Sequence, residues 1–284
     1  MQVKAHAKLN WYLDITGKRA DGYHLLDMLN QRLALHDTLT FEPGDALSLT
    51  IAGNDNLPTN NDNLILRAAC ALMQHTACRN GAHIHLIKRI PSGAGLGGGS
   101  ADAAATLLAL NQLWQLDMNL CDLQALGESL GADIPYCLAG GLKRVQGIGE
   151  QIEPVSVSVP SYNLLILQPA VSLATRDVFK AFHQSKDADL SWTVEDMLEA
   201  LRIGNLAMLQ NRQGNRLQRA ASRLAPQITQ AITDLYQYGA TFAQMTGSGS
   251  AVYGVFDNQV KITSAQRTLA TRYQVCLETS TIDY

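Results

Sequence analysis

The stretch Pro91-Ser92-Gly93-Ala94-Gly95-Leu96-Gly97-Gly98-Gly99-Ser100 runs directly into Ala101-Asp102-Ala103-Ala104-Ala105-Thr106-Leu107-Leu108. Its five closely spaced glycines let the backbone adopt positive φ angles and approach a bulky anion. The helix that follows points unpaired N–H groups and the positive end of its dipole back at the loop. A flexible linker is disfavoured, because the loop lies between an alternating strand and an Ala/Leu-rich helix. The stretch therefore predicts a phosphate site at a helix N-terminus.

Two familiar nucleotide motifs do not fit this loop. Gly93, Gly95 and Gly98 satisfy the dinucleotide pattern G-x-G-x-x-G. That pattern requires an acidic residue closing a second apolar strand about 20 residues further on, and here that distance falls in polar sequence after a helix. A P-loop requires Lys after its last glycine, whereas Gly99 is followed by Ser100. The loop is of a third kind, and its cation must come from elsewhere in the chain.

Composition describes a soluble globular protein. The 284 residues are 46% hydrophobic and 17% charged, with a net charge of −3. This charge gives no electrostatic reason to expect binding to nucleic acid or to an anionic membrane. The five cysteines, at positions 70, 78, 121, 137 and 276, form no C-x-x-C pair and suit reduced thiols. With neither an export signal nor an apolar span in view, we expect a cytoplasmic protein.

The N-terminal segment alternates apolar and polar residues from Val3 to Ile15, which predicts a long two-faced strand. Lys8 and Asn10 point the same way, and alternation alone favours a solvated face for them. The segment from Gly17 to His24 is a glycine-bounded loop, either a surface turn or an edge on which a base stacks.

Further strands are expected at 27–34, 37–41, 46–51 and 82–90, and helices at 64–76, 100–116 and 121–130. His83 and His85 share one face of their strand, where a solvated pair is favoured over a metal site because no third ligand suggests itself. Ser100 and Asp102 suit the first turn of the helix after the glycine loop. Asp133, two residues before Pro135, is with equal weight a cap for the next turn or a positioned base.

The Val/Ser/Pro-rich stretch 154–160 marks a domain boundary, which predicts an N-terminal domain at 1–157 and a C-terminal domain at 158–284. Strands and helices that alternate around antiparallel sheets indicate a two-domain α+β protein.

Four segments in the right order resemble the GHMP kinase superfamily. They are Ala7-Lys8-Leu9-Asn10 with the loop 17–24, the glycine stretch 91–101, Gly131-Ala132-Asp133-Ile134-Pro135 with 147–150, and Met245-Thr246-Gly247-Ser248-Gly249. The Asp-Gly-Tyr-His block at 21–24 narrows the resemblance to the branch whose substrate is a cytidine-diphosphate sugar alcohol of the non-mevalonate isoprenoid pathway. The sequence departs from the family pattern at His6, where proline is usual, and at Ser250-Ala251, where Pro-Thr is usual.

This resemblance implies a ribosomal-protein-S5-domain-2-like N-terminal domain, a ferredoxin-like C-terminal domain and an active site between them. Lys8 and Asp133 would form the catalytic pair, in which Asp133 accepts the proton of the substrate's C2 hydroxyl as it attacks the γ-phosphate and the ammonium keeps the carboxylate ionised. This implied role reverses the solvated-face interpretation of Lys8.

The resemblance also implies the ligand contacts. The phosphates of ATP would lie on the backbone of Pro91, Ser92, Gly93, Ala94, Gly95, Leu96, Gly97, Gly98, Gly99, Ser100 and Ala101. Mg²⁺ would bridge these phosphates, and the resemblance assigns it no direct protein ligand. The substrate, a small molecule carrying a cytidine diphosphate, would contact Asn10, Tyr23, His24, Thr175, Phe179, Gly247 and Ser248, with Tyr23 and Phe179 on either side of the cytosine ring. The protein would be a monomer or weak homodimer.

Two alternatives stay open at this stage. One is a kinase of the same superfamily that acts on a different small alcohol. The other is a nucleotide-binding module without catalysis, which the presence of both Lys8 and Asp133 disfavours.

Overall fold

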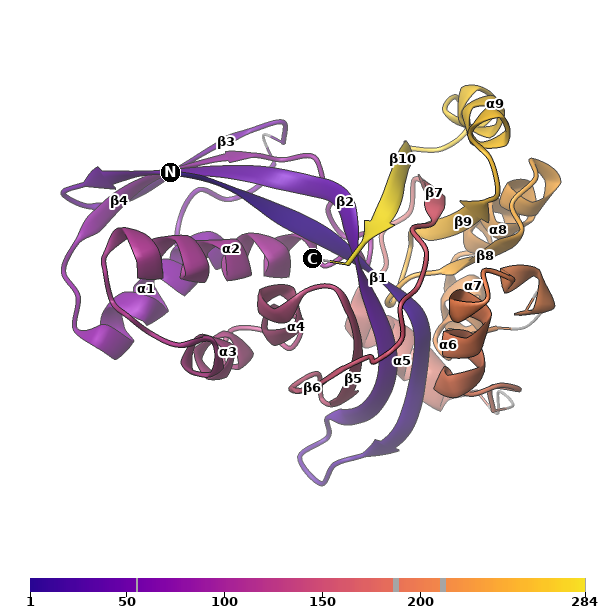
Figure 1. Cartoon of the computed structure of the whole chain (residues 1–284), viewed down its shortest axis with the longest axis horizontal. Coiled ribbons are helices and arrows are strands. Elements are labelled where there is room, and N and C mark those ends of the chain that lie inside the picture. The colour runs from indigo at the N-terminus through magenta and orange to yellow at the C-terminus, as the bar shows by residue number, and fades with distance from the viewer. Residues whose placement is uncertain (55, 186–188, 210–212, 284) are drawn as a thin grey trace.

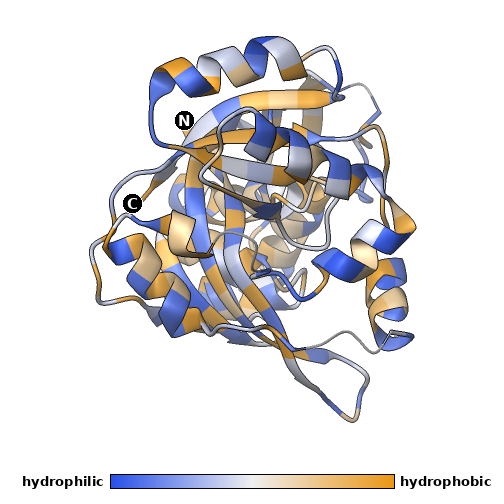
Figure 2. Ribbon diagram, turned by 90° about the vertical axis from the view of Figure 1, so that its right-hand side faces the viewer, coloured by the Kyte–Doolittle hydropathy of each residue, from blue (hydrophilic) through white to orange (hydrophobic). Residues whose placement is uncertain are grey.

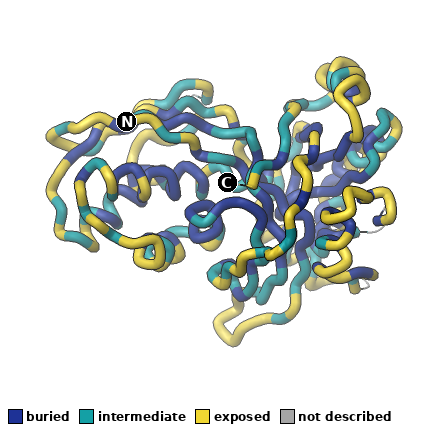
Figure 3. Tube along the Cα trace, in the orientation of Figure 1, coloured by how far each residue is buried: buried dark blue, intermediate teal, exposed yellow. Residues whose placement is uncertain are grey.

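A long antiparallel strand pair, β1 (Gln2–Lys18) and β2 (His24–Gly44), runs from the N-terminal side of the molecule past its middle to a loop at the bottom of the view (Figure 1). The computed structural model describes residues 1–54, 56–185, 189–209 and 213–283. The loop between the two strands projects from the body and is exposed (Figure 3). The sequence predicts separate strands at 27–34 and 37–41, whereas the structure has one continuous β2, because both stretches keep pairing with β1 across irregular register.

The N-terminal half builds a sheet on this pair and covers one side of it with helices (Figure 1). Its other strands are β3 (Leu47–Ala52), β4 (Gly81–Ile87), β5 (Leu142–Gly147) and β6 (Gln151–Pro154). Its helices are α1 (Leu64–Thr76), α2 (Gly98–Leu113), α3 (Leu120–Glu128) and α4 (Ile134–Ala139). Residues 101–107 of α2 are all buried, as expected of an alanine-rich helix enclosed on every side.

The C-terminal half has its own strands, β7 (Asn163–Gln168), β8 (Phe242–Met245), β9 (Val252–Phe256) and β10 (Val275–Ile282). Its helices are α5 (Thr175–His183), α6 (Val194–Arg202), α7 (Gln218–Leu224), α8 (Gln227–Gln237), α9 (Gln259–Leu269) and the short 3₁₀ turn η1 (Leu206–Leu209). β10 pairs with β7 and then with β2, so the last strand of the chain joins the two halves. Each helix of the described residues is too short or too polar to cross a bilayer.

The two faces of β1 serve different parts of the molecule. Ala7, Leu9 and Trp11 pack into one core with residues of the C-terminal strands, whereas Ala5 and Leu13 join a second core that holds the N-terminal helices together with other residues of the C-terminal half. Register shifts on either side of the 8–10 segment rotate the strand between these two cores. Orange and blue segments alternate along the strands accordingly (Figure 2). The polar face of β1 is covered as well, with Lys8 against the glycine loop and Asn10 against the C-terminal glycine turn at Thr246 and Gly247.

Candidate active site

Two cavities share the glycine loop as a wall. The larger, of about 540 Å³, is lined by the loop and by residues from both halves of the chain: Lys8, Leu13, Gly22, Tyr23, His24, Leu26, Met28, Gly93, Gly95, Gly97, Ser100, Ala132, Asp133, Ile148, Leu173, Thr175, Phe179, Leu217, Gly247, Ser248 and Gly249. The smaller, of about 320 Å³, is lined by residues 91–99 and by Leu57, Pro58, Asp62, Asn63, Leu64, Leu86, Lys88 and Asp102. A molecule bound along the loop can therefore extend into both spaces.

The glycine loop needs glycine at the positions where it is most closely packed. Gly97 precedes α2 with φ +70°, and a β-carbon there would lie 2.9 Å from Cγ of Lys8. Gly95 has φ +75°, and a β-carbon there would lie 2.5 Å from the carbonyl oxygen of Thr246. The Lys8 N–H also donates to the Leu96 carbonyl at 2.9 Å. The loop is thus held against β1 and the C-terminal glycine turn, with the N-terminus of α2 facing the cavity.

Lys8 and Asp133 meet at the wall of the larger cavity. Lys8 Nζ lies 3.6 Å from Asp133 Oδ2, with 5% of the lysine side chain and 38% of the aspartate side chain exposed. Lys8 comes from the middle of β1, and Asp133 occupies the position before α4, whose second residue is Pro135. Asp133 makes no side-chain cap hydrogen bond to α4, so of the two sequence interpretations the capping one is not seen. A buried ammonium beside an accessible carboxylate is suited to proton transfer next to a phosphate.

Asn10 lies behind this pair and is fully buried. Its Oδ1 accepts from Lys8 Nζ at 3.0 Å and from the Gly247 N–H at 3.0 Å. Its Nδ2 donates to Asn30 Oδ1 at 2.6 Å. Asn10 is not among the residues that line either cavity. The structure therefore gives this side chain a positioning role, in which one amide oxygen holds both the lysine and the C-terminal glycine turn.

The aromatic residues expected around a base lie at the outer end of the larger cavity. The Phe179 ring lies parallel to the His24 ring, with centroids 4.3 Å apart and an interplanar angle of 19°. The Tyr23 side chain lines the cavity from the β1–β2 loop, and the residue is 61% exposed. Thr175 Oγ1 and Ser248 Oγ share a hydrogen bond of 2.9 Å, which links α5 to the C-terminal glycine turn. The structure thus gathers residues that are up to 225 positions apart in the chain, from Tyr23 to Ser248.

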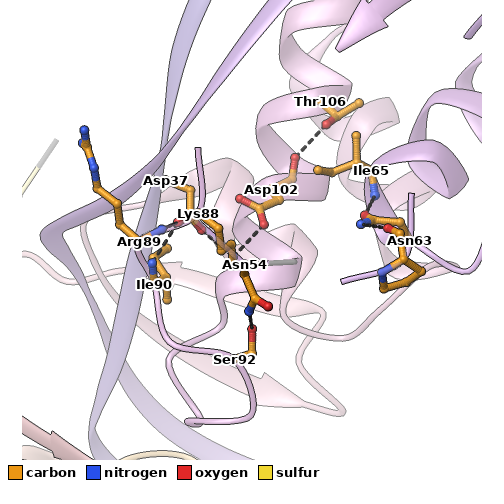
Figure 4. Close-up of polar contacts among 11 residues, drawn as sticks. Asp37, Asn54, Asn63, Ile65, Lys88, Arg89, Ile90, Ser92, Asp102 and Thr106 are labelled. Atoms are coloured by element: carbon orange, nitrogen blue, oxygen red, sulfur yellow. Dashed lines mark hydrogen bonds and ion pairs between the residues drawn. The ribbon is translucent and has the colours of Figure 1, made fainter. Parts of the chain in front are cut away.

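The smaller cavity contains a buried ion cluster that the sequence analysis did not single out. Lys88 Nζ contacts Asp37 Oδ2 at 2.5 Å and Asp102 Oδ2 at 2.8 Å (Figure 4). Asp102 was expected to serve the helix N-terminus, but Gly97 precedes α2 without a side-chain cap, and Asp102 instead binds Lys88. The available signal was the position of Lys88, which ends an alternating strand just before the glycine loop.

Electrostatics in this cluster are set by burial. Burial raises the pKa of the Asp102 carboxyl to about 7, against the opposing effect of Lys88. Burial lowers the pKa of Lys88, but the carboxylates of Asp102 and Asp37 outweigh it and the net direction is upward. Asp102 Oδ1 is buried without a hydrogen-bond partner. The cluster links Lys88, the residue after β4, to β2 and α2 next to the glycine loop, where a β-carbon at Gly98 would lie 3.0 Å from Lys88 Nζ.

Among the described residues, no three His, Cys, Asp or Glu side chains converge in a way that could hold a metal ion. His83 and His85 instead bond to Ser48 and Thr50 on the neighbouring strand.

Known proteins resemble this chain in sequence and in fold. The family model described as GHMP kinases N terminal domain matches residues 63–141, and the model described as GHMP kinases C terminal matches residues 197–275. A 4-diphosphocytidyl-2-C-methyl-D-erythritol kinase from Alkaliphilus metalliredigens is 35% identical, over 96% of this chain and 94% of the relative. One of the same name from Delftia acidovorans is 41% identical, over 93% of this chain and 89% of the relative.

Comparison with solved structures supports the same family. A crystal structure of 4-(cytidine 5'-diphospho)-2C-methyl-D-erythritol kinase matches with a TM-score of 0.83 at 33% identity, covering 99% of each chain. A homoserine kinase from Cytophaga hutchinsonii matches with a TM-score of 0.74 at 20% identity, covering 100% of this chain and 94% of that one. The second likeness concerns the fold alone.

Proposed function

This chain belongs to the GHMP kinases and, within them, to the 4-diphosphocytidyl-2-C-methyl-D-erythritol kinases, and from this premise we propose that it transfers the γ-phosphoryl group of ATP to the C2 hydroxyl of 4-diphosphocytidyl-2-C-methyl-D-erythritol. The products are the 2-phosphate and ADP, a step of the non-mevalonate route to isoprenoid precursors. The observation that carries the proposal is the contact of Lys8 and Asp133 at 3.6 Å on the wall of a cavity that the glycine loop closes.

ATP is placed along the glycine loop. Its phosphates would accept from backbone N–H groups of residues 91–101 at the N-terminus of α2. Its nucleoside would occupy the smaller cavity, because this space shares the loop as a wall and is lined by neither Lys8 nor Asp133. The γ-phosphate then lies on the side of the larger cavity, within reach of an acceptor hydroxyl.

Asp133 is the proposed general base. It takes the proton of the C2 hydroxyl while that oxygen forms a bond to the γ-phosphorus, and the bond between the γ-phosphorus and the bridging oxygen of ADP breaks. Lys8 offsets negative charge at the reacting centre, and Asn10 holds the ammonium in place. Phosphoryl transfer depends mainly on positioning and electrostatics. Both side chains come from constrained backbone, a paired strand and a proline-containing turn.

The cytidine end of the substrate is assigned to the outer part of the larger cavity. Tyr23 and Phe179 provide aromatic faces for the base, and His24 and Thr175 provide polar groups near its edge. Gly247 and Ser248 would contact the substrate from the C-terminal glycine turn.

The described residues contain no group of three His, Cys, Asp or Glu side chains that could hold a metal ion. Magnesium would therefore be held mainly by the phosphates of ATP. Mg²⁺ binds oxygen ligands and keeps several waters, and the Ser100 hydroxyl lines the cavity next to the loop. When bound, the ion would neutralise phosphate charge. We further propose that the protein acts in the cytoplasm as a monomer or weak homodimer.

A coupled ADP-release assay tests the proposed function. Purified protein with ATP and Mg²⁺ is expected to release ADP with 4-diphosphocytidyl-2-C-methyl-D-erythritol and not with homoserine or mevalonate, which other kinases of this fold phosphorylate. Turnover of homoserine or mevalonate without turnover of the cytidylyl substrate would contradict the proposal. Binding of ATP without ADP release from any alcohol would identify a non-catalytic module instead.

A further inference from the structure

One face of α5 contributes three side chains to the neighbourhood of the base site. Thr175, Phe179 and His183 follow one another at intervals of four residues, which places them on the same side of the helix. Thr175 and Phe179 line the larger cavity, whereas His183 lies outside its lining. His183 is therefore a neighbour of the base site that no family motif of this sequence includes.

His183 reaches the site through His24. The Nε2 atoms of the two imidazoles are joined by a hydrogen bond, with the ring centroids 4.7 Å apart. The Phe179 ring covers a face of the same His24 ring at 4.3 Å between centroids. Two residues of α5 thus fix the His24 side chain, one through a ring face and the other through a ring nitrogen.

A hydrogen bond between two imidazole nitrogens also constrains their hydrogens. One nitrogen must carry a hydrogen and the other must be bare. His183 is exposed and His24 is partly buried in the cavity wall. Burial, followed by the charges of His183 and Lys18, lowers the pKa of His24. Of the two possible arrangements, the one in which His24 Nε2 is bare and accepts from His183 places the hydrogen of His24 on Nδ1.

We propose that His183 is a positioning residue for base recognition: its hydrogen bond to His24 Nε2 holds the His24 ring in place and makes Nδ1 a hydrogen-bond donor toward an acceptor atom of the substrate's pyrimidine. No hydrogen bond to His24 Nδ1 is seen within the described part of the chain, so this nitrogen is available to a ligand. The assignment of a pyrimidine rests on the proposed function. The geometry of the histidine pair does not depend on it.

Kinetics of two variants test the proposal. His183→Phe keeps a ring but removes the hydrogen bond, and it should raise the KM for the cytidylyl substrate about five-fold, the scale of one neutral hydrogen bond. The KM for ATP and kcat should stay within about two-fold, since His183 touches neither the loop nor the reacting atoms. His183→Gln, whose amide can donate to His24, should restore most of the affinity. His85→Phe, at an exposed histidine on β4, is the matched control and should leave all three constants unchanged.

An unchanged substrate KM in His183→Phe, or equal damage in the Phe and Gln variants, would overturn the proposal. Nitrogen-15 spectra of the imidazoles provide a readout that does not need turnover. They should show the hydrogen of His24 on Nδ1 in the wild type and its loss to a mixture of tautomers in His183→Phe. The same His24 spectrum in both proteins would also overturn the proposal. A wild type that fails to phosphorylate the cytidylyl substrate but gives the expected spectra would refute the proposed function and leave the histidine pair standing.

Discussion

Lys8 Nζ lies 3.6 Å from Asp133 Oδ2 although the two residues are 125 positions apart in the chain. The two side chains meet because the glycine loop packs against β1 at Lys8 and the turn before α4 brings Asp133 to the same place. Asn10 fixes the lysine end, and the backbone before Pro135 fixes the aspartate end.

Asp133→Asn keeps the size of the side chain and removes the proton acceptor. We expect kcat to fall by about 10²- to 10⁴-fold, the usual contribution of a general base, with little change in the KM for ATP. Asp122→Asn, in the exposed first turn of α3, is the matched control and should behave as the wild type. Steady-state ADP release measures both. Substantial turnover by Asp133→Asn would exclude the aspartate as the base.

Gly97→Ala is expected to reduce kcat/KM more than about ten-fold. The left-handed backbone costs an L-residue about 1–2 kcal/mol, and the new β-carbon would lie 2.9 Å from Cγ of Lys8 and displace it. Gly99→Ala is the comparison within the same stretch: its β-carbon would lie 3.5 Å from Leu64 Cδ1, an ordinary contact, so any loss in this variant measures crowding of the bound phosphates and not displacement of Lys8. Similar kinetics for the two variants would show that packing against Lys8 does not matter.

Tyr23→Ala should raise the KM for the cytidylyl substrate and leave the KM for ATP unchanged. Stacking of a base on an aromatic side chain is worth about 1–3 kcal/mol, which corresponds to a KM increase of about 5- to 150-fold. Because Tyr23 is 61% exposed, its loss should not change the free energy of unfolding appreciably. Substrate titrations and urea unfolding check the two statements. A substrate KM that does not move would mean that no base stacks on Tyr23.

Asp102→Asn should flatten the dependence of stability on pH. Burial raises the pKa of Asp102 to about 7 in the folded protein, above the value of about 3.9 for an unfolded chain. The folded state therefore binds more protons between these values, so the free energy of unfolding falls as pH rises from about 4 through 7. Asparagine cannot ionise and removes this decline.

Urea unfolding of wild type and Asp102→Asn at pH 5, 6, 7 and 8 measures the effect. The difference in free energy of unfolding between the two proteins should shift in favour of the variant as pH rises, by an amount on the order of 2 kcal/mol. A difference that stays constant over this range would show that Lys88 keeps Asp102 ionised throughout.

The sequence predicts part of the site well, because some features are local. A glycine loop followed by an alanine-rich helix predicts backbone with positive φ at a helix N-terminus, and the structure has this arrangement at Gly93, Gly95 and Gly97. The order of the motifs along the chain predicts the family, which the comparisons confirm. The roles of the individual site residues and the boundary at 157/158 stay predictions.

Other features could not be predicted from the sequence pattern, because they depend on which segments pack against each face of a strand. Alternation alone placed Lys8 on a solvated face, but the glycine loop packs against the side chain and Lys8 is buried. The residues next to Lys88 in the sequence do not indicate that the carboxylates of Asp37 and Asp102 contact its ammonium group. The hydrogen bond between His24 and His183 spans 159 positions.

Sequence by itself determined the glycine loop, the helix behind it and the long two-faced strand, because backbone freedom, helix propensity and strand alternation act between neighbours in the chain. Only the tertiary structure decided which side chains meet: Lys8 with Asp133 at 3.6 Å, Lys88 with two carboxylates, and His24 with His183. The physical reason is that burial and pairing of charge depend on distances in space. For Lys8, the packing of β1 against the glycine loop sets that distance.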